Sequence, residues 1–266
     1  MNDEGRIIDL SVEVPGTPEE VWEAIATGPG ITSWFVPHAV EERLGGRVSM
    51  NFGPEFGEEA AEVTAWEPPH RFEMRSGGDR PLAFEWLVEA RDGGTCVVRL
   101  VNSGFGPGED WDGDFEGMSS GWRLFLENLR LHRMHFAGRQ GRAITPTRMT
   151  EGPLVAAFER LCAELGVPAD LTEGDRFATS GAEVPVLTGS VTSVHTSPAT
   201  TTYFLLLDGP ASGHGFVSAE GGDGGVAVSV YVYLYGDAAR ELGDEISPFL
   251  ARCFPAPQAA AVAAER

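Results

Sequence analysis

Short apolar segments separated by turn residues occupy much of the first half of this 266-residue chain, from Val48 to Val101. The separators are Gly-Pro, Pro-Pro, Gly-Gly-Asp and Asp-Gly-Gly, which are typical of turns and leave no room for a crossover helix. Strands joined so closely pair as hairpins, so the pattern predicts an antiparallel meander and excludes a parallel βαβ sheet. The predicted strands read VSMNF, EEAAEVTAW, RFEMR, LAFEWLVEA and TCVVRLV.

A helix is predicted on each side of this meander. After a first strand at Ile7–Val14, Thr17 and Glu20 have the spacing of a capping box, and Pro18 takes the first helical position, where its missing N–H costs nothing. Beyond the meander, apolar side chains recur at spacings of three and four over Met118–Phe136, which predicts an amphipathic helix. We therefore expect an α+β fold, with an antiparallel sheet wrapped around this long C-terminal helix.

The second half of the chain repeats the order of helix, antiparallel strands and closing helix. Arg47 and the VTAW segment are echoed by Arg176 and the VTSV segment, at spacings of 16 and 15 residues from the arginine. We expect a tandem duplication with a first domain at 1–137, a polar linker at 138–150 and a second, degenerate domain at 151–266. The alternative is that any two meanders with end helices look alike.

The charge balance excludes several functions. The chain has 40 acidic and 19 basic residues, a formal charge of −21, and every basic residue is arginine. Without lysine, Schiff-base chemistry and P-loop phosphate binding are excluded, because both need an ammonium group. The acidic balance argues against nucleic acid and anionic membrane surfaces as partners, since both demand basic side chains.

The distribution of apolar residues and cysteines favours a cytoplasmic protein. No apolar run approaches the roughly 18 residues of a membrane span. The N-terminus shows no basic segment followed by an apolar one, as a signal peptide would. The three cysteines lie far apart and form no ligand-spaced pair, which suits a reducing compartment.

Five segments between Ile7 and His135 carry a family resemblance. They read PGTPEEVWEAIATGPGITSWF, GGRVSM, VTAWEPPHRFEM, GGTCVVRLVNSGF and GWRLFLENLRLH. In this order they resemble the activator of Hsp90 ATPase homologue-like family, part of the helix-grip (SRPBCC) superfamily with START-like and polyketide-cyclase-like members. The second half is similar only through GDRF, the VTSV strand and the closing helix. The resemblance implies tandem helix-grip (START-like) domains, with a pocket between the sheet and the long helix of the first domain.

The resemblance also implies a range of functions for the first domain. Many family members bind small apolar molecules, polyketide-processing relatives are cyclases or dehydratases, and the family name implies a chaperone partner. Relatives often place a His or Glu just before the SGF segment, where this chain has Asn102. A neutral amide cannot serve as a general base, so no catalytic residue is assigned.

Aromatic side chains are dense in the first half, and they are either ordinary core or the lining of a ligand pocket. Period-two alternation places Val98, Leu100 and Asn102 on one strand face, with Asn102 as a polar group that orients the ligand. Trp122 would form the facing wall, and His38 would lie on a loop, at the pocket mouth or simply on the surface. The candidate ligand-binding residues are Trp34, Phe35, His38, Trp66, Trp86, Val98, Leu100, Asn102, Trp122 and Phe125.

Other polar groups support weaker hypotheses. Arg43 and Arg47 would hold a ligand carboxylate or simply pair with neighbouring glutamates. His132 and His135 share a helix face, but a third ligand at matching spacing is missing, so no metal or cofactor is predicted. The acidic segment Glu109–Glu116 is expected to be a solvated loop.

Three tyrosines in the second half leave two interpretations open. Tyr231, Tyr233 and Tyr235 alternate, so they share one strand face. That face is either the lining of a second pocket or a packing surface between the two domains.

The sequence therefore favours binding of a small hydrophobic or aromatic molecule by a carrier, a sensor or a sequestering protein, with no reaction assigned. The first alternative is a polyketide cyclase or dehydratase-like enzyme. The second is a co-chaperone-like activator of a heat-shock-protein ATPase.

Overall fold

The chain forms two seven-stranded antiparallel sheets with helices, which confirms the predicted α+β class and the tandem helix-grip architecture. The computed structural model describes residues 5–222, 225–236 and 239–255. The first sheet has the order β1-β7-β6-β5-β4-β3-β2, so consecutive strands from β2 to β7 are neighbours, as the meander predicts. Its strands are β1 (Arg6–Pro15), β2 (His38–Val40), β3 (Arg47–Asn51), β4 (Glu58–Glu67), β5 (Arg71–Ser76), β6 (Ala83–Arg91) and β7 (Thr95–Phe105).

The first helix of the first unit begins at the predicted capping box. The backbone N–H of Glu20 donates to the Thr17 hydroxyl, and the Glu20 carboxylate accepts from the N–H of Thr17, which confirms the capping box. The elements are α1 (Pro18–Ala26), α2 (Gly28–Thr32), the 3-10 turn η1 (Glu109–Trp111) and the long helix α3 (Asp112–Phe136).

Helix α3 begins before its predicted start at Met118. The segment Glu109–Glu116, expected to be a loop, forms η1 and the first turn of α3. Carboxylates in a first helical turn interact favourably with the positive end of the helix dipole, and this favours extension of the helix. Arg80 also pairs with Asp114 at 3.2 Å, which ties this turn to the sheet side of the unit.

The second unit has the strand order β10-β11-β12-β13-β14-β8, with β9 also paired to β14. Residues 138–150, expected to be a linker, contain both β8 and β9. These edge strands are short and half-exposed, so few apolar residues reveal them in the sequence. The elements are β8 (Arg142–Ile144), β9 (Thr147–Thr150), α4 (Leu154–Leu165), β10 (Arg176–Ala178), β11 (Thr188–Thr196), β12 (Thr200–Gly209), β13 (Ser212–Gly222), β14 (Gly225–Tyr235) and α5 (Ala239–Cys253).

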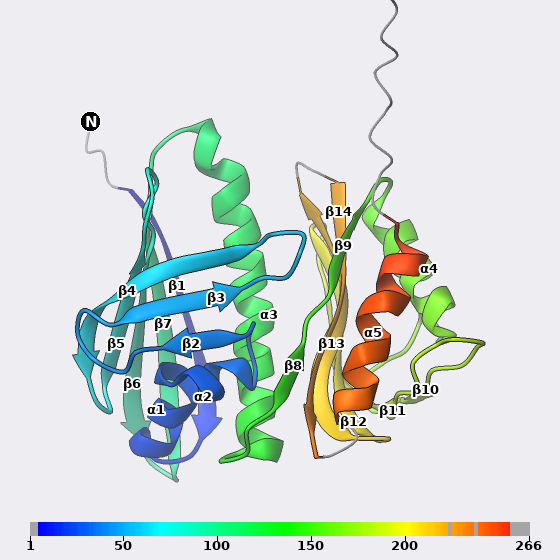
Figure 1. Cartoon of the computed structure of the whole chain (residues 1–266), viewed down its shortest axis with the longest axis horizontal. Coiled ribbons are helices and arrows are strands. Elements are labelled where there is room, and N and C mark those ends of the chain that lie inside the picture. The colour runs from blue at the N-terminus through cyan, green and yellow to red at the C-terminus, as the bar shows by residue number, and fades with distance from the viewer. Residues whose placement is uncertain (1–4, 223–224, 237–238, 256–266) are drawn as a thin grey trace, which may run out of the picture.

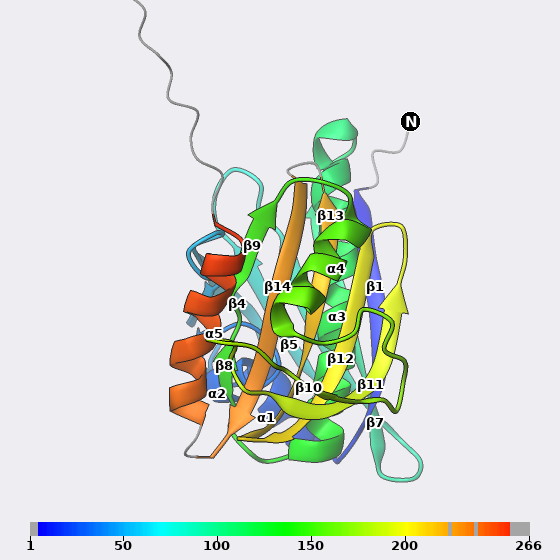
Figure 2. The same ribbon diagram turned by 90° about the vertical axis from the view of Figure 1, so that its right-hand side faces the viewer.

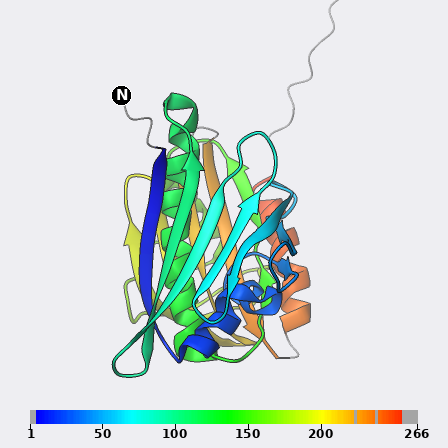
Figure 3. The ribbon, with the colours of Figure 1, turned by 90° about the vertical axis from the view of Figure 1, so that its left-hand side faces the viewer.

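Helix α3 lies between the two sheets, as Figure 1 shows, and it packs on β1 of the first sheet and on β12 and β13 of the second. Helices α4 and α5 cover the opposite face of the second sheet (Figure 2). Helices α1 and α2 lie together at one end of the first sheet (Figure 3). The order of layers is therefore sheet, helix, sheet, helices. No helix in the described part of the chain is both long and apolar enough to cross a membrane.

The face of the second sheet that meets α3 carries the alternating tyrosines. Tyr231 and Tyr233 are buried in one apolar cluster with Leu124 and Leu131 of α3. The ring of Tyr231 also lies 5.9 Å from that of Phe125, centroid to centroid. Of the two interpretations of this face, the structure supports the packing surface between the units.

A chain of buried hydrogen bonds crosses the same interface. The Asn128 amide donates to the carbonyl oxygen of Trp34 at 2.5 Å, and its oxygen lies 2.9 Å from Nδ1 of His214. Nε2 of His214 lies 3.2 Å from the Tyr235 hydroxyl, which lies 2.8 Å from Nδ1 of His132. The hydroxyl of Tyr233, by contrast, is buried without a hydrogen-bond partner among the described residues.

These two tyrosines define a matched pair of substitutions. We expect Tyr235→Phe to lower the free energy of unfolding by about 1–3 kcal/mol, because it leaves Nδ1 of His132 without a partner, whereas Nε2 of His214 keeps the Ser33 carbonyl oxygen at 3.1 Å. Tyr233→Phe removes a buried hydroxyl without a partner, so its unfolding free energy should equal or exceed that of the wild type. Urea unfolding measures both, and equal losses in the two variants would contradict the role of the hydrogen-bond chain.

Candidate functional site

The structure brings five of the predicted aromatic residues into one cluster, named here the aromatic cluster. Its members are Trp34 and Phe35 after α2, Trp86 on β6, and Trp122 and Phe125 on α3. The Phe35 ring lies 5.0 Å from that of Trp122 and 4.3 Å from that of Phe125. The Trp86 ring lies 5.7 Å from that of Trp34 and 5.4 Å from that of Trp122. The cluster thus joins the sheet to α3 through edge-to-face and tilted ring contacts.

Strand β7 presents the predicted row of side chains to the inside of the unit. Val98, Leu100 and Asn102 are all buried, which confirms that they share one face. Leu100 is the cross-strand partner of Trp86, and Asn102 that of Phe84, whose ring lies 5.9 Å from Trp122. This row therefore lies beside the aromatic cluster.

Trp66 lies apart from the aromatic cluster. It is half-buried on β4, and its ring contacts those of Trp22, at 5.0 Å, and Phe72, at 5.6 Å. Through these contacts Trp66 packs α1 against the sheet, in a part of the core away from the aromatic cluster.

Asn102 is fully buried, and half of its amide is unsatisfied. Its Nδ2 donates to the carbonyl oxygen of Ala83 at 3.1 Å, which fixes the orientation of the amide. Its Oδ1 is buried and accepts no hydrogen bond from the described part of the chain. A buried carbonyl without a donor costs about 1–3 kcal/mol.

His38 has a second buried acceptor. It begins strand β2, whereas a loop position was expected, because pairing with Met50 draws it into the sheet. Its ring lies 5.3 Å from that of Phe35, at the edge of the aromatic cluster. Burial lowers the pKa of His38 to about 4, so the ring is neutral at pH 7. Nδ1 donates to the carbonyl oxygen of Val36 at 2.7 Å, which leaves Nε2 as an acceptor without a partner among the described residues.

The arginines suggested for a ligand carboxylate are engaged elsewhere. Arg43 pairs with Glu41 at 2.7 Å and Arg47 pairs with the same carboxylate at 3.3 Å, and both guanidinium groups are well exposed. The alternative interpretation, pairing with a neighbouring glutamate, is the one that the structure supports.

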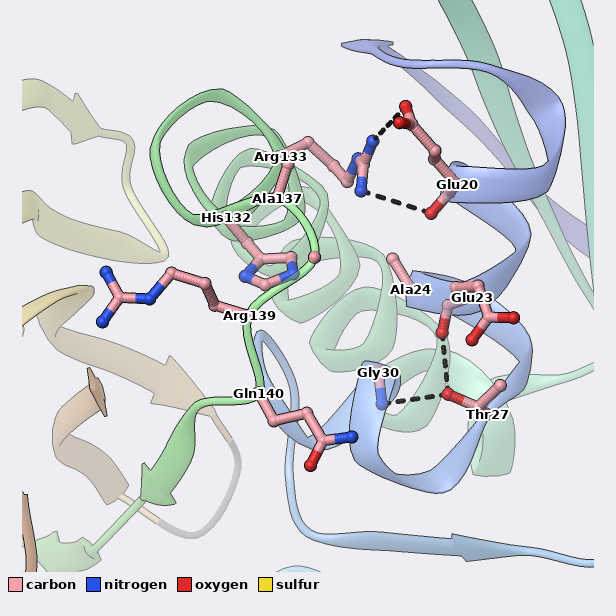
Figure 4. A pocket seen from close by; sticks show the side chains of 11 residues that line it. Glu20, Glu23, Ala24, Thr27, Gly30, His132, Arg133, Ala137, Arg139 and Gln140 are labelled. Carbon is pink, nitrogen blue, oxygen red and sulfur yellow. Dashed lines mark hydrogen bonds and ion pairs between the residues drawn. The ribbon is translucent and has the colours of Figure 1, made fainter. Parts of the chain in front are cut away.

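A pocket of about 260 Å³ lies at the C-terminal end of α3, and Figure 4 shows its walls. We name it the α3 C-terminal pocket. Glu20, Glu23 and Thr27 line it from α1 and the turn after it, and His132 lines it from α3. The remaining lining residues are Ala24, Gly30, Arg133, Ala137, Gly138, Arg139 and Gln140.

Sequence reasoning missed this pocket, because its walls come from segments about a hundred residues apart. His132 was considered only as half of a metal pair with His135. The structure buries His132 and exposes His135, so the two rings do not act together. The described residues include no group of three or more His, Cys, Asp or Glu side chains arranged to hold a metal ion.

Arg133 supports the wall of the pocket without offering a free charge. Its guanidinium is buried and donates to the carbonyl oxygens of Pro15 and Glu20 and, at 3.4 Å, to the Glu20 carboxylate. Burial lowers the pKa of Arg133, and the Glu20 carboxylate opposes that shift. Figure 4 shows this pair at the rim formed by α1.

Comparison with known proteins supports the family resemblance. Residues 15–132 match the family model for activator of Hsp90 ATPase homolog 1-like protein. A search among curated proteins gives no significant match.

Some of the similar solved structures match about half of this chain, and one matches nearly all of it. Protein MLL2253 from Mesorhizobium loti is 22% identical, with 47% of this chain and 95% of that chain covered at a TM-score of 0.43. PFC0360w, an HSP90 activator from Plasmodium falciparum, is 19% identical, with 48% and 95% covered at a TM-score of 0.40. DynU16, a protein of the dynemicin biosynthetic locus, is 17% identical, with 93% and 95% covered at a TM-score of 0.43.

The lowered pKa of His38 makes stability depend on pH. The ordinary pKa of about 6.5 applies in the unfolded chain, so unfolding takes up a proton between pH 6.5 and about 4. The stabilisation is therefore complete above pH 6.5 and is lost as the pH falls, with a share for His38 of about 3 kcal/mol by the linkage relation. Urea unfolding of His38→Phe should show a smaller loss between pH 7 and pH 4.5 than the wild type. Equal losses would contradict the buried, neutral state of this ring.

Proposed function

We propose that the first unit, whose residues 15–132 match the family model for activator of Hsp90 ATPase homolog 1-like protein, binds a small apolar or aromatic molecule that carries a hydrogen-bond donor. The proposed site lies between the sheet and α3, at the aromatic cluster and the β7 row. Its residues are Trp34, Phe35, His38, Trp86, Val98, Leu100, Asn102, Trp122 and Phe125.

The observation that carries this proposal is the pair of buried acceptors without donors. Oδ1 of Asn102 and Nε2 of His38 both border the aromatic cluster, and both lack partners in the described chain. A ligand hydroxyl or N–H would satisfy either one and recover about 1–3 kcal/mol. These two acceptor atoms favour a ligand with an O–H or N–H group. They disfavour a ligand carboxylate, because its oxygen lone pairs would face the lone pairs of the two acceptors. A phenol-like molecule therefore fits better than a fatty acid.

Aromatic walls would supply most of the binding energy, and the polar groups would supply orientation. Trp122 and Phe35 present large apolar faces from α3 and from the segment after α2. The Asn102 amide is held in place by Ala83, so it offers a fixed acceptor to the ligand. This division of roles suits a carrier, a sensor or a sequestering protein.

The same groups argue against acid–base catalysis at this site. Asn102 is a neutral amide, and His38, with a pKa of about 4, is a weak base at pH 7. A polyketide cyclase-like reaction at these residues would therefore lack a general base. We therefore rank binding above a cyclase or dehydratase.

Association with an Hsp90-type ATPase is the second proposal, and it follows from the family match of residues 15–132. Co-purification with such an ATPase, together with a change in its turnover, would support it. A protein that neither associates with the ATPase nor changes its turnover is not a co-chaperone.

The binding proposal predicts a preference for donors. We expect 2-naphthol to bind about tenfold more tightly than 2-methoxynaphthalene, because the methyl ether cannot donate a hydrogen bond. Asn102→Leu should reduce this ratio, and Trp122→Ala should weaken binding of both compounds. Fluorescence titration measures the affinities, and circular dichroism establishes that each variant is folded.

Trp111→Ala is the matched control for these titrations. Trp111 contacts Phe105, outside the proposed site, so its removal should leave both affinities unchanged. Equal affinity for the two naphthalenes in the wild type, or unchanged affinity in both Asn102→Leu and Trp122→Ala, would refute the site.

A further inference from the structure

We propose that a groove between β1, α3 and β11 binds an extended peptide segment, which adds a strand to the free edge of β1 and places one carboxylate at Arg123. We name it the edge groove, and its volume is about 440 Å³. Figure 2 shows β1 and β11 on the same side of the molecule. None of the residues of the apolar site proposed above lines this groove, so the inference stands independently of that function.

Both strands that border the edge groove have a free edge there. Strand β1 is the last strand of the first sheet and pairs only with β7. In the second sheet, β10 covers β11 only from Thr188 to Ser190, so residues 193–196 of β11 pair with β12 alone within the described part of the chain. A free edge exposes backbone N–H and C=O groups with which another strand can pair.

The lining residues show that the groove meets the edges of these strands and not the faces of the sheets. Side chains on one face of a strand come from alternate residues, so a groove over a sheet face is lined by every second residue. Here three consecutive residues line the groove on each side, residues 10–12 of β1 and residues 193–195 of β11. An occupant therefore meets the hydrogen-bonding groups of the main chain. An extended peptide matches such groups, as it does in recognition by strand addition.

Strand β1 is better suited to accept a new strand than β11, which is bulged beside the groove. Residues 8–14 of β1 contain no lysine, proline or register shift, the usual features that protect an edge. The two acidic side chains of this segment bond to side chains of β7 and not across the free edge. Arg99 donates to Asp9 and Thr95 donates to Glu13, each at 2.6 Å.

The charges of the edge groove favour an occupant with a carboxylate. Arg123 lines the groove from α3, is exposed, and forms no ion pair with the described residues. Glu127, the one carboxylate among the lining residues, accepts two hydrogen bonds from Arg130, at 2.8 and 2.5 Å. The guanidinium of Arg123 is therefore available to a carboxylate of the occupant. Since the whole chain has a charge of −21, a peptide with many acids would be repelled, and a single carboxylate suits the groove better.

The pleat of an added strand sets the order of its side chains. Leu10 and Val12 of β1 pack toward the first core, on the side where β1 meets α3. Alternate side chains of a strand beside β1 would therefore face α3, and these positions suit apolar groups near Leu126 and a carboxylate near Arg123. The positions between them face solvent and suit polar groups. The hexapeptide TVTDTV, acetylated and amidated at its ends, has this order.

Titration of the whole protein with this hexapeptide, followed by amide NMR, tests the role of Arg123. We expect TVTDTV to bind about twofold to fivefold more tightly than TVTNTV, as for an exposed ion pair. Arg123→Gln should abolish this preference. Arg75→Gln should keep it, because Arg75 is an exposed arginine on β5, outside the groove and without an ion pair in the described chain.

Hydrogen exchange and N-methylated probes test the pairing itself. Bound TVTDTV should slow exchange at amides of β1 and leave those of β2, the opposite edge of the first sheet, unchanged. Only alternate N–H groups of an added strand point at its neighbour. Methylation of the amides of residues two, four and six of the hexapeptide, or of residues one, three and five, should therefore weaken binding at least tenfold in one case and much less in the other.

Four results would overturn the proposal. The first two are no binding of TVTDTV and equal affinities of TVTDTV and TVTNTV for the wild type. The third is an equal effect of the two methylation patterns, which would indicate apolar contact without strand pairing. The fourth is slow exchange of the β1 amides in the peptide-free protein together with a dimer in analytical ultracentrifugation, which would show that a second copy of the chain covers this edge.

Discussion

Helix α3 is packed on both sides, and the arrangement of the molecule depends on this double burial. Trp122, Leu126 and Leu129 belong to the core of the first unit, while Leu124 and Leu131 join the cluster of the second sheet. An amphipathic helix normally buries one stripe and exposes the other. Because α3 buries two stripes, the second unit replaces solvent on the face that would otherwise be exposed.

Apolar packing alone would hold the two units together without fixing their register. The hydrogen bonds of Asn128, His214, Tyr235 and His132 add direction, because each donor must meet one acceptor across the interface. A shift of one unit along α3 would leave several of these buried groups unpaired, at about 1–3 kcal/mol each. The same network holds the ring of His132 at the α3 C-terminal pocket, so interface specificity and pocket chemistry share their residues.

The sequence was informative where local chemistry decides structure. The turn residues between Val48 and Val101, the capping box at Thr17 and the alternation of the tyrosines each predicted an element or a face that the structure contains. The early start of α3 was not predicted, because the dipole interaction of Asp112 and Asp114 leaves no apolar periodicity. The short strands β8 and β9 were missed because their pairing with β14 is a long-range contact.

The candidate sites show the same division. Residues of one strand or one helix turn were grouped correctly, as with Val98, Leu100 and Asn102 on β7. The α3 C-terminal pocket could not be found in this way, since Glu23 and His132 are far apart in the sequence and line one pocket only in the folded chain. Period and spacing likewise do not reveal that Asn102 and His38 keep unpaired acceptors, because that depends on every neighbour in the folded core.

Native mass spectrometry of the protein purified from its own host tests the central claim, that the first unit holds an apolar molecule with a hydrogen-bond donor at Asn102 and His38. The account predicts a bound small molecule that contains at least one O–H or N–H group and is lost from the Asn102→Leu variant. A polypeptide with no added mass, or a bound molecule without such a group, would contradict it.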